Sequence, residues 1–309
     1  MEKPAGAPLN PAKGLPPLEP GSTRSAAGDG RQASGRGRGR AREALRRSGA
    51  IFYPLLLLAL VVGAWEGGVS LFEMPHYILP APSLVAKTLV EKRAVFARHT
   101  LVTASEVAAG GALGITVGIA LGLAMFFFAP LEKALYPLLI ASQNVPVFAV
   151  APLLVVWLGY GFVSKVVMAA IIVFFPITVS ALDGLKRTDT DLIRLFHTMG
   201  ASRGQILWKL RFPAALPALF SGLKMSAVYA TIGAVIGEWV GAGAGLGYLM
   251  LSANAQLRVA EVFGAIICLT PIGLLLLGLV VWAEHRLLPW QRKSRDGGWR
   301  PPLPAAAKP

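Results

Sequence analysis

The chain has 309 residues, of which 54% are hydrophobic, and it carries a formal net charge of +14 at pH 7. A soluble domain is about 45–50% apolar. Here the apolar residues gather in runs of about 20 residues, the length that crosses a bilayer as a helix. The composition therefore excludes an ordinary soluble domain and predicts an all-α integral membrane protein.

The first 49 residues are rich in Pro, Gly, Ala, Ser and Arg and contain almost no large apolar side chains. Such a segment cannot bury enough surface to fold, so residues 1–49 are predicted to form a disordered, basic tail. The alternating Arg36, Arg38 and Arg40 are typical either of an RNA-binding tract or of a basic anchor beside a membrane. We favour the anchor because a membrane span follows directly, and anionic lipid then explains the positive charge without a nucleic-acid partner.

Six apolar runs predict a transmembrane domain over residues 50–285. The predicted spans are residues 51–71, 102–127, 134–158, 164–185, 216–240 and 262–283. An even number of spans places both ends of the chain on one side of the membrane. Most of the basic residues lie in the N-terminal tail, in the loop 186–215 and in the Pro-rich tail 286–309. The positive-inside rule therefore predicts that all three are cytoplasmic.

The segment after the first span reads LPAPSLV over residues 79–85, and its prolines favour an extended chain. An amphipathic helix is predicted to follow on the outer surface, over residues 84–100. The second span then carries a glycine at every fourth position from Gly110 to Gly122. These glycines form one bare helical stripe that lets another helix approach closely, either as a moving interface or as static packing.

The third span is interrupted by polar residues and prolines. Ser142, Gln143 and Asn144 precede Pro146, and Pro152 follows. Such residues are costly at membrane depth unless they face protein or water. The pattern predicts either a broken helix that lines a solute path or polar contacts that hold neighbouring helices together.

The fifth span contains a single acidic residue, Glu238, followed by Trp239. Glu238 is interpreted either as a substrate or gating contact, or as a side chain that reaches the membrane interface. Six glycines between Gly233 and Gly247 make a continuous helix there unfavourable, so a re-entrant turn or short gating element is predicted.

The cytoplasmic loop 186–215 is predicted to form two short helices around Gly200. Asp189 or Asp191 is suited to begin the first helix, and Gly200 to end it with a positive φ. Ser202 is suited to cap a second helix, Arg203–Leu210, which Pro213 would end. Apolar side chains recur at helical spacing on the first helix, at Leu192, Leu195, Phe196 and Met199. This face is predicted to bind a groove on another protein; the alternative is that it rests on the inner membrane surface.

Catalytic and metal-binding patterns are missing from the sequence. The four histidines are scattered, the single cysteine is Cys268, and no GxxxxGK[ST] phosphate loop is present. The sequence therefore predicts a chain that is not an enzyme and binds no cofactor or metal itself.

The cytoplasmic loop resembles the EAA coupling loop of ABC-importer permeases, E-A-A-x3-G-x9-I-x-L-P. Gly200, Leu210, Phe212 and Pro213 fit that pattern, whereas Arg194, Leu195 and Phe196 stand where Glu-Ala-Ala is usual. The resemblance assigns the contact with an ATP-hydrolysing subunit to these loop residues: Asp191, Arg194, Leu195, Phe196, Gly200, Ala201, Leu210, Phe212 and Pro213.

Other segments extend the resemblance to ABC-importer permeases over residues 77–291. They resemble most closely the branch that carries nitrate, sulfonates, taurine and hydroxymethylpyrimidine. QNVPVFAVAPLLVVWLGYG (residues 143–161) and GEWVGAGAGLGYL (residues 237–249) carry it. It implies a six-helix permease bundle of the MetI-like, type I importer fold in a bacterial inner membrane. It also implies a homodimer, ATPase subunits that bind ATP and Mg, and an external substrate-binding protein. The translocation path is assigned to Gln143, Asn144, Pro146, Glu238 and Trp239.

The solute is expected to be a pyrimidine-type thiamine precursor, or else a sulfonate, nitrate or taurine. The polar groups identified within the spans are neutral or acidic, apart from Lys224 near the inner side. A neutral heterocycle is therefore favoured over an anion. The alternative function is a stand-alone secondary transporter or channel, which would need inverted repeats or an intramembrane ion relay.

Overall fold

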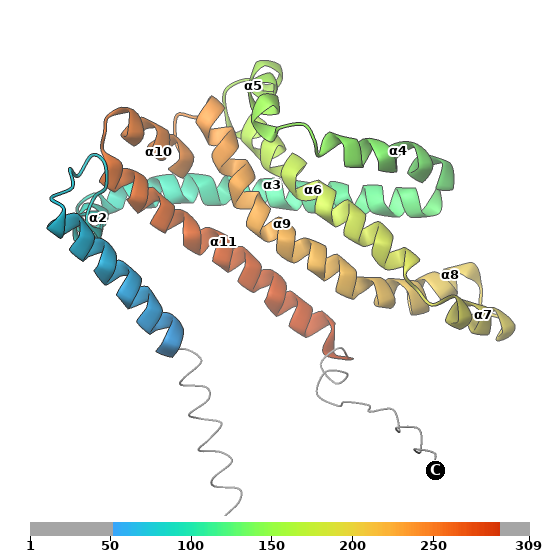
Figure 1. The fold of residues 1–309 in the computed structure, drawn as a ribbon. Helices are drawn as coiled ribbons and strands as arrows, with labels where there is room; N and C mark the ends of the chain where they lie inside the picture. Colours follow the sequence, from blue (N-terminus) through green and yellow to red (C-terminus); the bar gives the residue numbers. More distant parts are fainter. Residues whose placement is uncertain (1–51, 291–309) are drawn as a thin grey trace, which may run out of the picture. The chain divides into compact units, whose positions relative to one another are not determined.

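The computed structural model describes residues 52–290, and every regular element in this range is helical (Figure 1). A helix over Phe52–Leu71 comes first. The elements that follow are α2 (Pro82–Glu91), α3 (Arg93–Phe127), α4 (Ala129–Ser142), α5 (Val147–Leu158), α6 (Phe162–Lys186), α7 (Thr190–Thr198), α8 (Arg203–Ile206), the π-helix η1 (Leu207–Arg211), α9 (Phe212–Gly241), α10 (Leu246–Ala255) and α11 (Val259–Leu287).

The chain divides into two units, residues 1–63 and 64–309. In the first unit, the described residues 52–63 are helical and exposed. The second unit holds the helix bundle described below. The predicted tails lie outside the described residues, except for residues 286–290 at the end of α11 and just beyond it.

Five described helices are long and apolar enough to cross a membrane, and a sixth crossing arises if α4 and α5 are counted as one. Those two helices are bent by 105° at the break between them. The predicted span 134–158 is therefore two helices. The chain turns at residues 143–146, and α5 begins after Pro146, whose ring and missing N–H prevent a continuous helix.

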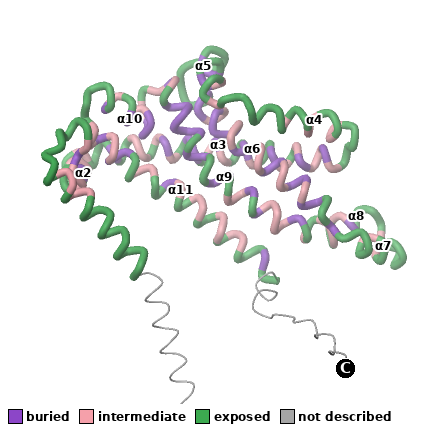
Figure 2. Tube along the Cα trace, viewed as in Figure 1, coloured by how far each residue is buried: buried purple, intermediate pink, exposed green. Residues whose placement is uncertain are grey.

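The core is built from α3, α6 and α9, which carry most of the buried residues of the bundle (Figure 2). The glycine stripe of α3 lies directly on α6. A Cβ on Gly114 would come within 2.7 Å of the Val173 side chain, and one on Gly118 would come within 2.7 Å of the Phe174 carbonyl oxygen. The predicted close approach of two helices is confirmed, and its partner is α6.

Two predicted outer elements differ from the structure. The helix expected over residues 84–100 breaks at Lys92, so that α2 ends at Glu91 and α3 already begins at Arg93. The glycine-rich segment is helical as far as Gly241, and the predicted interruption comes only at residues 242–245, before the short helix α10. Gly233 and Gly237 each lie against the backbone of α6, so burial of this face offsets the low helix propensity of glycine.

The second helix of the cytoplasmic loop also differs from the prediction. It does not stop at Pro213, because the chain remains helical from Arg203 to Gly241. The π-helical turn η1 bridges the junction, and the N–H of Phe212 donates to the carbonyl of Leu207. Pro213 lies in the first turn of α9. Proline is tolerated there because its missing N–H needs no partner within that helix.

Candidate translocation path and coupling segment

A cavity of about 860 Å³ lies between α5, α6 and α9, at the bend that follows α4. Its walls are mostly apolar and aromatic, with side chains such as Phe148, Phe175 and Ile232. Its polar groups are the hydroxyls of Ser142 and Tyr229 and the amide of Gln143, and no Asp, Glu, Lys, Arg or His lines it among the described residues. Such a cavity suits an uncharged molecule with a flat apolar face and a few hydrogen-bonding groups.

The structure brings only some of the predicted path residues to this cavity. Gln143 lines it, while Asn144 and Pro146 form the turn beside it. Trp239 stacks on the cavity residue Phe148, with ring centroids 5.9 Å apart. Glu238 is not among the lining residues; it is 1% exposed and belongs to a separate polar cluster.

The cytoplasmic loop has the predicted capping chemistry. The Asp189 carboxylate accepts from the N–H of Asp191 at the start of α7, and Ser202 with Gln205 forms a capping box at the start of α8. Gly200 has φ +78°, and the N–H of Ala201 donates to the carbonyl of Phe196. This hydrogen-bond pattern is typical of a helix that ends in a left-handed glycine. The two caps and the glycine turn are confirmed.

The outward face of α7 is apolar and exposed. Leu192, Leu195 and Met199 are 44%, 53% and 75% exposed, whereas Phe196 is half-buried. Figure 2 shows α7 as mostly exposed, at the end of the bundle away from α10. Phe196, expected on the same face, turns partly toward the protein. The exposed apolar face of α7 therefore consists of Leu192, Leu195 and Met199, without the predicted Phe196.

The remaining coupling residues are spread over the loop. Arg194 pairs with Asp191 at 3.2 Å, and both side chains are more than 70% exposed. Leu210 is half-buried in the π-helical turn, and the ring of Phe212 packs on Trp208, with centroids 5.2 Å apart. The arginine that replaces the usual glutamate therefore has a partner within its own helix.

A buried polar cluster joins α3, α6, α9 and α10, and Glu238 is its one member among the site residues predicted from the sequence. Glu106 accepts from Lys165 Nζ at 2.6 Å, and Glu238 accepts from the Thr103 hydroxyl at 2.6 Å. Glu106 and Glu238 are each 1% exposed. The overlooked signal was an ionisable residue inside an apolar span, Glu106 in one and Lys165 in another. Lys224 was therefore not the single cation within the spans.

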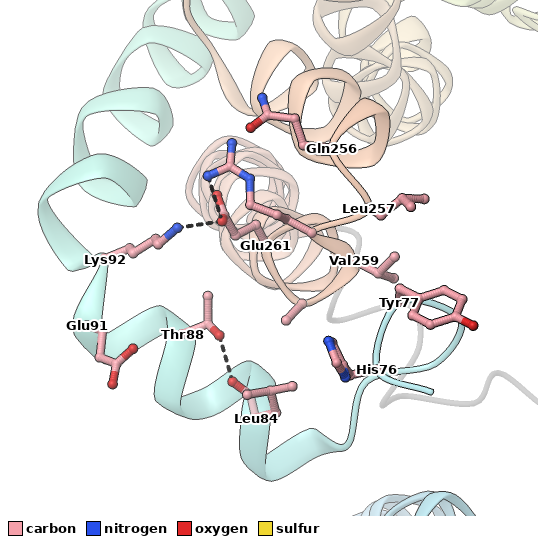
Figure 3. Close-up of a pocket in the computed structure, with 12 residues that line it drawn as sticks. His76, Tyr77, Leu84, Thr88, Glu91, Lys92, Gln256, Leu257, Val259 and Glu261 are labelled. Carbon is pink, nitrogen blue, oxygen red and sulfur yellow. Dashed lines mark hydrogen bonds and ion pairs between the residues drawn. The ribbon is translucent and has the colours of Figure 1, made fainter. Parts of the chain in front are cut away.

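A second cavity, of about 460 Å³, lies between α2, the segment before it and the α10–α11 turn (Figure 3). Lys92 and Arg258 line it, and both bind the buried carboxylate of Glu261, at 2.5 and 3.1 Å. Both cations of this pocket are already paired within the chain. The uncharged cavity at α5, α6 and α9 is therefore the better candidate for a solute path.

Comparison with known proteins matches residues 114–289, more than half of the chain, to the family "Binding-protein-dependent transport system inner membrane component". A "Probable ABC transporter permease protein" of Haemophilus influenzae is 42% identical, over 76% of this chain and 96% of that protein. The "Formylaminopyrimidine transport permease protein ThiX" of Halalkalibacterium halodurans is 39% identical, over 81% of this chain and all of that protein. The "Riboflavin transport system permease protein RibX" of Chloroflexus aurantiacus is 37% identical, over 78% of this chain and 91% of that protein.

Among solved structures, an inward-facing MetNI methionine ABC transporter matches with a TM-score of 0.53 at 20% identity. The match covers 65% of this chain and 97% of the other chain, and it supports the MetI-like fold. The chain therefore belongs to the family of binding-protein-dependent inner membrane transport components, and it is a multi-span ABC-importer permease rather than an enzyme.

Proposed function

We propose that this permease carries a small, uncharged aromatic heterocycle, of the pyrimidine type, through the cavity between α5, α6 and α9. The observation that supports this most is the lining of that cavity, which combines aromatic side chains with an amide and hydroxyls and no charged group. A charged solute, such as a sulfonate or the zwitterion taurine, would leave water without meeting an oppositely charged side chain there. Relatives named for formylaminopyrimidine and riboflavin transport agree with a ring-shaped solute.

A second copy of the chain is proposed to close this path. The cavity is bordered by exposed residues of α4 and α5, and Gln143 itself is exposed at the bend. An amide facing lipid would be costly, whereas one facing water or protein is not. A homodimer would place two such cavities around one central route.

The outward face of α7 is proposed to dock on a separate ATPase subunit, which binds ATP and Mg. Its exposed leucines and methionine, next to the glycine turn, suit a groove on a soluble partner. Closure of the ATPase pair would then move α7 and, through the continuous helix from Arg203 to Gly241, shift α9 at the cavity wall. Both ends of the chain are proposed to lie in the cytoplasm, with an external binding protein that delivers the solute on the opposite side.

The solute is tested by transport into vesicles that contain the permease purified with its native ATPase and binding protein. We expect ATP-dependent uptake of radiolabelled formylaminopyrimidine, and no uptake of taurine under the same conditions. Gln143→Leu should lower the uptake by about tenfold, the effect of losing one polar contact of about 1.4 kcal/mol. Uptake of taurine instead would refute the heterocycle and favour the sulfonate group, while uptake without the ATPase would favour a stand-alone transporter.

The docking surface is tested by co-purification. Leu195→Asp places a charge in the outward face of α7 and should release the ATPase subunit from the tagged permease. Leu257→Asp is the matched control, because Leu257 is similarly exposed, at 64%, but lies in the α10–α11 turn at the opposite end of the bundle. Equal loss of the ATPase from both variants would contradict a specific contact at α7.

A further inference from the structure

A third cavity, of about 370 Å³, lies where the end of α3 meets the cytoplasmic loop. Small-molecule sites have volumes of about 300–1,000 Å³, so this cavity is large enough to hold a ligand. The end of α3 contributes Phe126 and Phe127 to its walls, α7 contributes Ile193 and His197, α8 contributes Arg203, and η1 contributes Arg211. It is separate from the proposed solute path between α5, α6 and α9.

This cavity carries positive charge without a compensating acid. Arg203 and Arg211 both line it, and among the described residues no Asp or Glu does. None of the ion pairs within residues 52–290 includes either arginine. Two guanidinium groups on one cavity repel each other, and an anion between them removes that repulsion. The cavity therefore differs from the one beside Glu261, where both cations are paired within the chain.

Arg211 is positioned by an aromatic ring of α3. Its guanidinium carbon lies 5.2 Å from the centre of the Phe126 ring, and the residue is half-buried. A guanidinium group that stacks on a ring keeps its N–H donors at its edge, where two of them can bind two oxygens of one ligand. Such a fork matches a carboxylate or a phosphate group. The stacking also reduces the side-chain freedom that would be lost when a ligand binds.

The surroundings of the cavity are typical of the level of lipid headgroups. The continuous helix Arg203–Gly241 has 39 residues, a length of about 58 Å, whereas the hydrocarbon core of a bilayer is about 30 Å thick. Phe127 is 57% exposed, and Trp208, next to the lining residue Leu207, is 66% exposed. Aromatic side chains are enriched where the membrane meets water, and arginines near helix ends reach the same level.

The cavity and the proposed ATPase contact use different faces of α7. Ile193 and His197 line the cavity, and because they are four residues apart they lie on one face of the helix. The exposed apolar face proposed for the ATPase consists of Leu192, Leu195 and Met199. A ligand in the cavity would therefore leave that apolar face uncovered.

We infer that this cavity binds a phosphate group, which Arg203 and Arg211 hold by charge-assisted hydrogen bonds. An anionic phospholipid supplies such a group at the headgroup level, and the exposed ring of Phe127 then lies beside its glycerol and acyl chains. His197 adds a polar side chain from α7. A bound lipid would therefore connect α7 with the end of α3 and with the long helix Arg203–Gly241.

The test is native mass spectrometry of the full-length chain in a neutral detergent with added phosphatidylglycerol. We expect phosphatidylglycerol to stay bound more tightly than diacylglycerol with the same acyl chains, which lacks the phosphate. Arg211→Gln and Arg203→Gln should each weaken phosphatidylglycerol binding by about tenfold, because each removes a charged donor. Lys209→Gln is the matched control: it removes the same charge two residues from Arg211, but Lys209 is not among the residues that line the cavity. It should leave the binding nearly unchanged.

The inference is overturned if diacylglycerol binds as tightly, or if Lys209→Gln weakens binding as much as Arg211→Gln, since acyl chains or general positive charge would then explain the binding. Titration calorimetry of the delipidated chain with inorganic phosphate distinguishes the source of the group. Phosphate binding that Arg211→Gln abolishes, without phosphatidylglycerol binding, would support the phosphate site and overturn the lipid as its source. Arg203 is exposed, so Arg203→Gln should fold normally, and it decides alone if Arg211→Gln does not fold. Neither measurement depends on the transported solute or on the ATPase.

Discussion

The two ends of the bundle each carry an ion pair, one buried within the chain and the other exposed. Near α10, the ion pair of Glu106 and Lys165 is 1% and 7% exposed and fully enclosed by the chain. At α7, the ion pair of Asp191 and Arg194 is 85% and 77% exposed, beside Leu192 and Leu195, which are 44% and 53% exposed. The first ion pair is enclosed by the chain itself, whereas the second lies beside the exposed apolar face that we propose docks on the ATPase. The proposed ATPase contact therefore lies at the end of the bundle whose charged and apolar side chains remain exposed.

The largest effect on stability is expected from Lys165→Met. Removing one member of a buried ion pair costs about 3–5 kcal/mol, because the remaining charge stays buried without a partner. Lys186→Met breaks the more exposed pair with Glu132 and should cost about 1 kcal/mol or less. Thermal unfolding of both variants in detergent measures the contrast, and equal losses would mean that the buried end is no more sensitive than the exposed one.

Overpacking the interface of α3 and α6 should have the next largest effect on stability. Gly118→Leu forces a side chain against the backbone of Phe174 and the Ile177 side chain, which should destabilise the bundle by about 3 kcal/mol. The matched control is Gly111→Leu, on the same helix, where nothing lies within 4 Å of an added Cβ. Size-exclusion profiles and melting temperatures should separate the two variants. A stable Gly118→Leu protein would argue that the α3–α6 contact is loose and able to move.

At the exposed end, Gly200→Val should affect coupling more than folding. Valine at φ +78° costs about 1–3 kcal/mol of local strain, which the loop can relieve by changing the turn that orients α7. Gly204→Val is the control, because Gly204 is also open but its φ is not in the left-handed region. We expect Gly200→Val to insert into the membrane normally. In the purified complex with the ATPase, however, added solute should no longer increase the rate of ATP hydrolysis.

The smallest effect is expected from Arg194→Ala. The exposed pair with Asp191 contributes about 0.5 kcal/mol or less, so the melting temperature should stay unchanged. A titration of the ATPase subunit against the permease then isolates any direct contact of Arg194 with the partner. Weaker binding by this variant would show that the partner is adapted to an arginine, and unchanged binding would show that the cation serves only α7.

The structure could be anticipated from the sequence wherever local chemistry decides it. Asp189, Gly200 and Ser202 carry the capping signals of the loop, and the glycine stripe of α3 predicted a close helix contact; these signals act within a few residues or along one helix face. The bend at residues 143–146 followed from Pro146 in the same way. Each of these features depends on residues close together in the chain.

Features that depend on contacts between residues far apart in the chain could not be predicted from local sequence signals. The helix through Gly233 and Gly237 persists because those residues pack on α6, which no local propensity reveals. Pro213 alone predicts the end of a helix, whereas in the structure it lies in the first turn of α9, directly after the π-helical turn η1. The position of the Glu238 side chain depends on its hydrogen bond with Thr103, which lies 135 residues earlier in the chain.

The most direct test of the proposed coupling through α7 is solute uptake by the complete transporter in vesicles, measured with the original chain and with Gly200→Val. If α7 couples ATP hydrolysis to the path, the original chain and Gly204→Val should show ATP-dependent uptake of formylaminopyrimidine. Gly200→Val should lose this uptake although the protein remains folded and inserted. Undiminished ATP-driven uptake by Gly200→Val, or uptake that needs no ATPase subunit, would contradict the proposal that α7 transmits ATP hydrolysis to the membrane path.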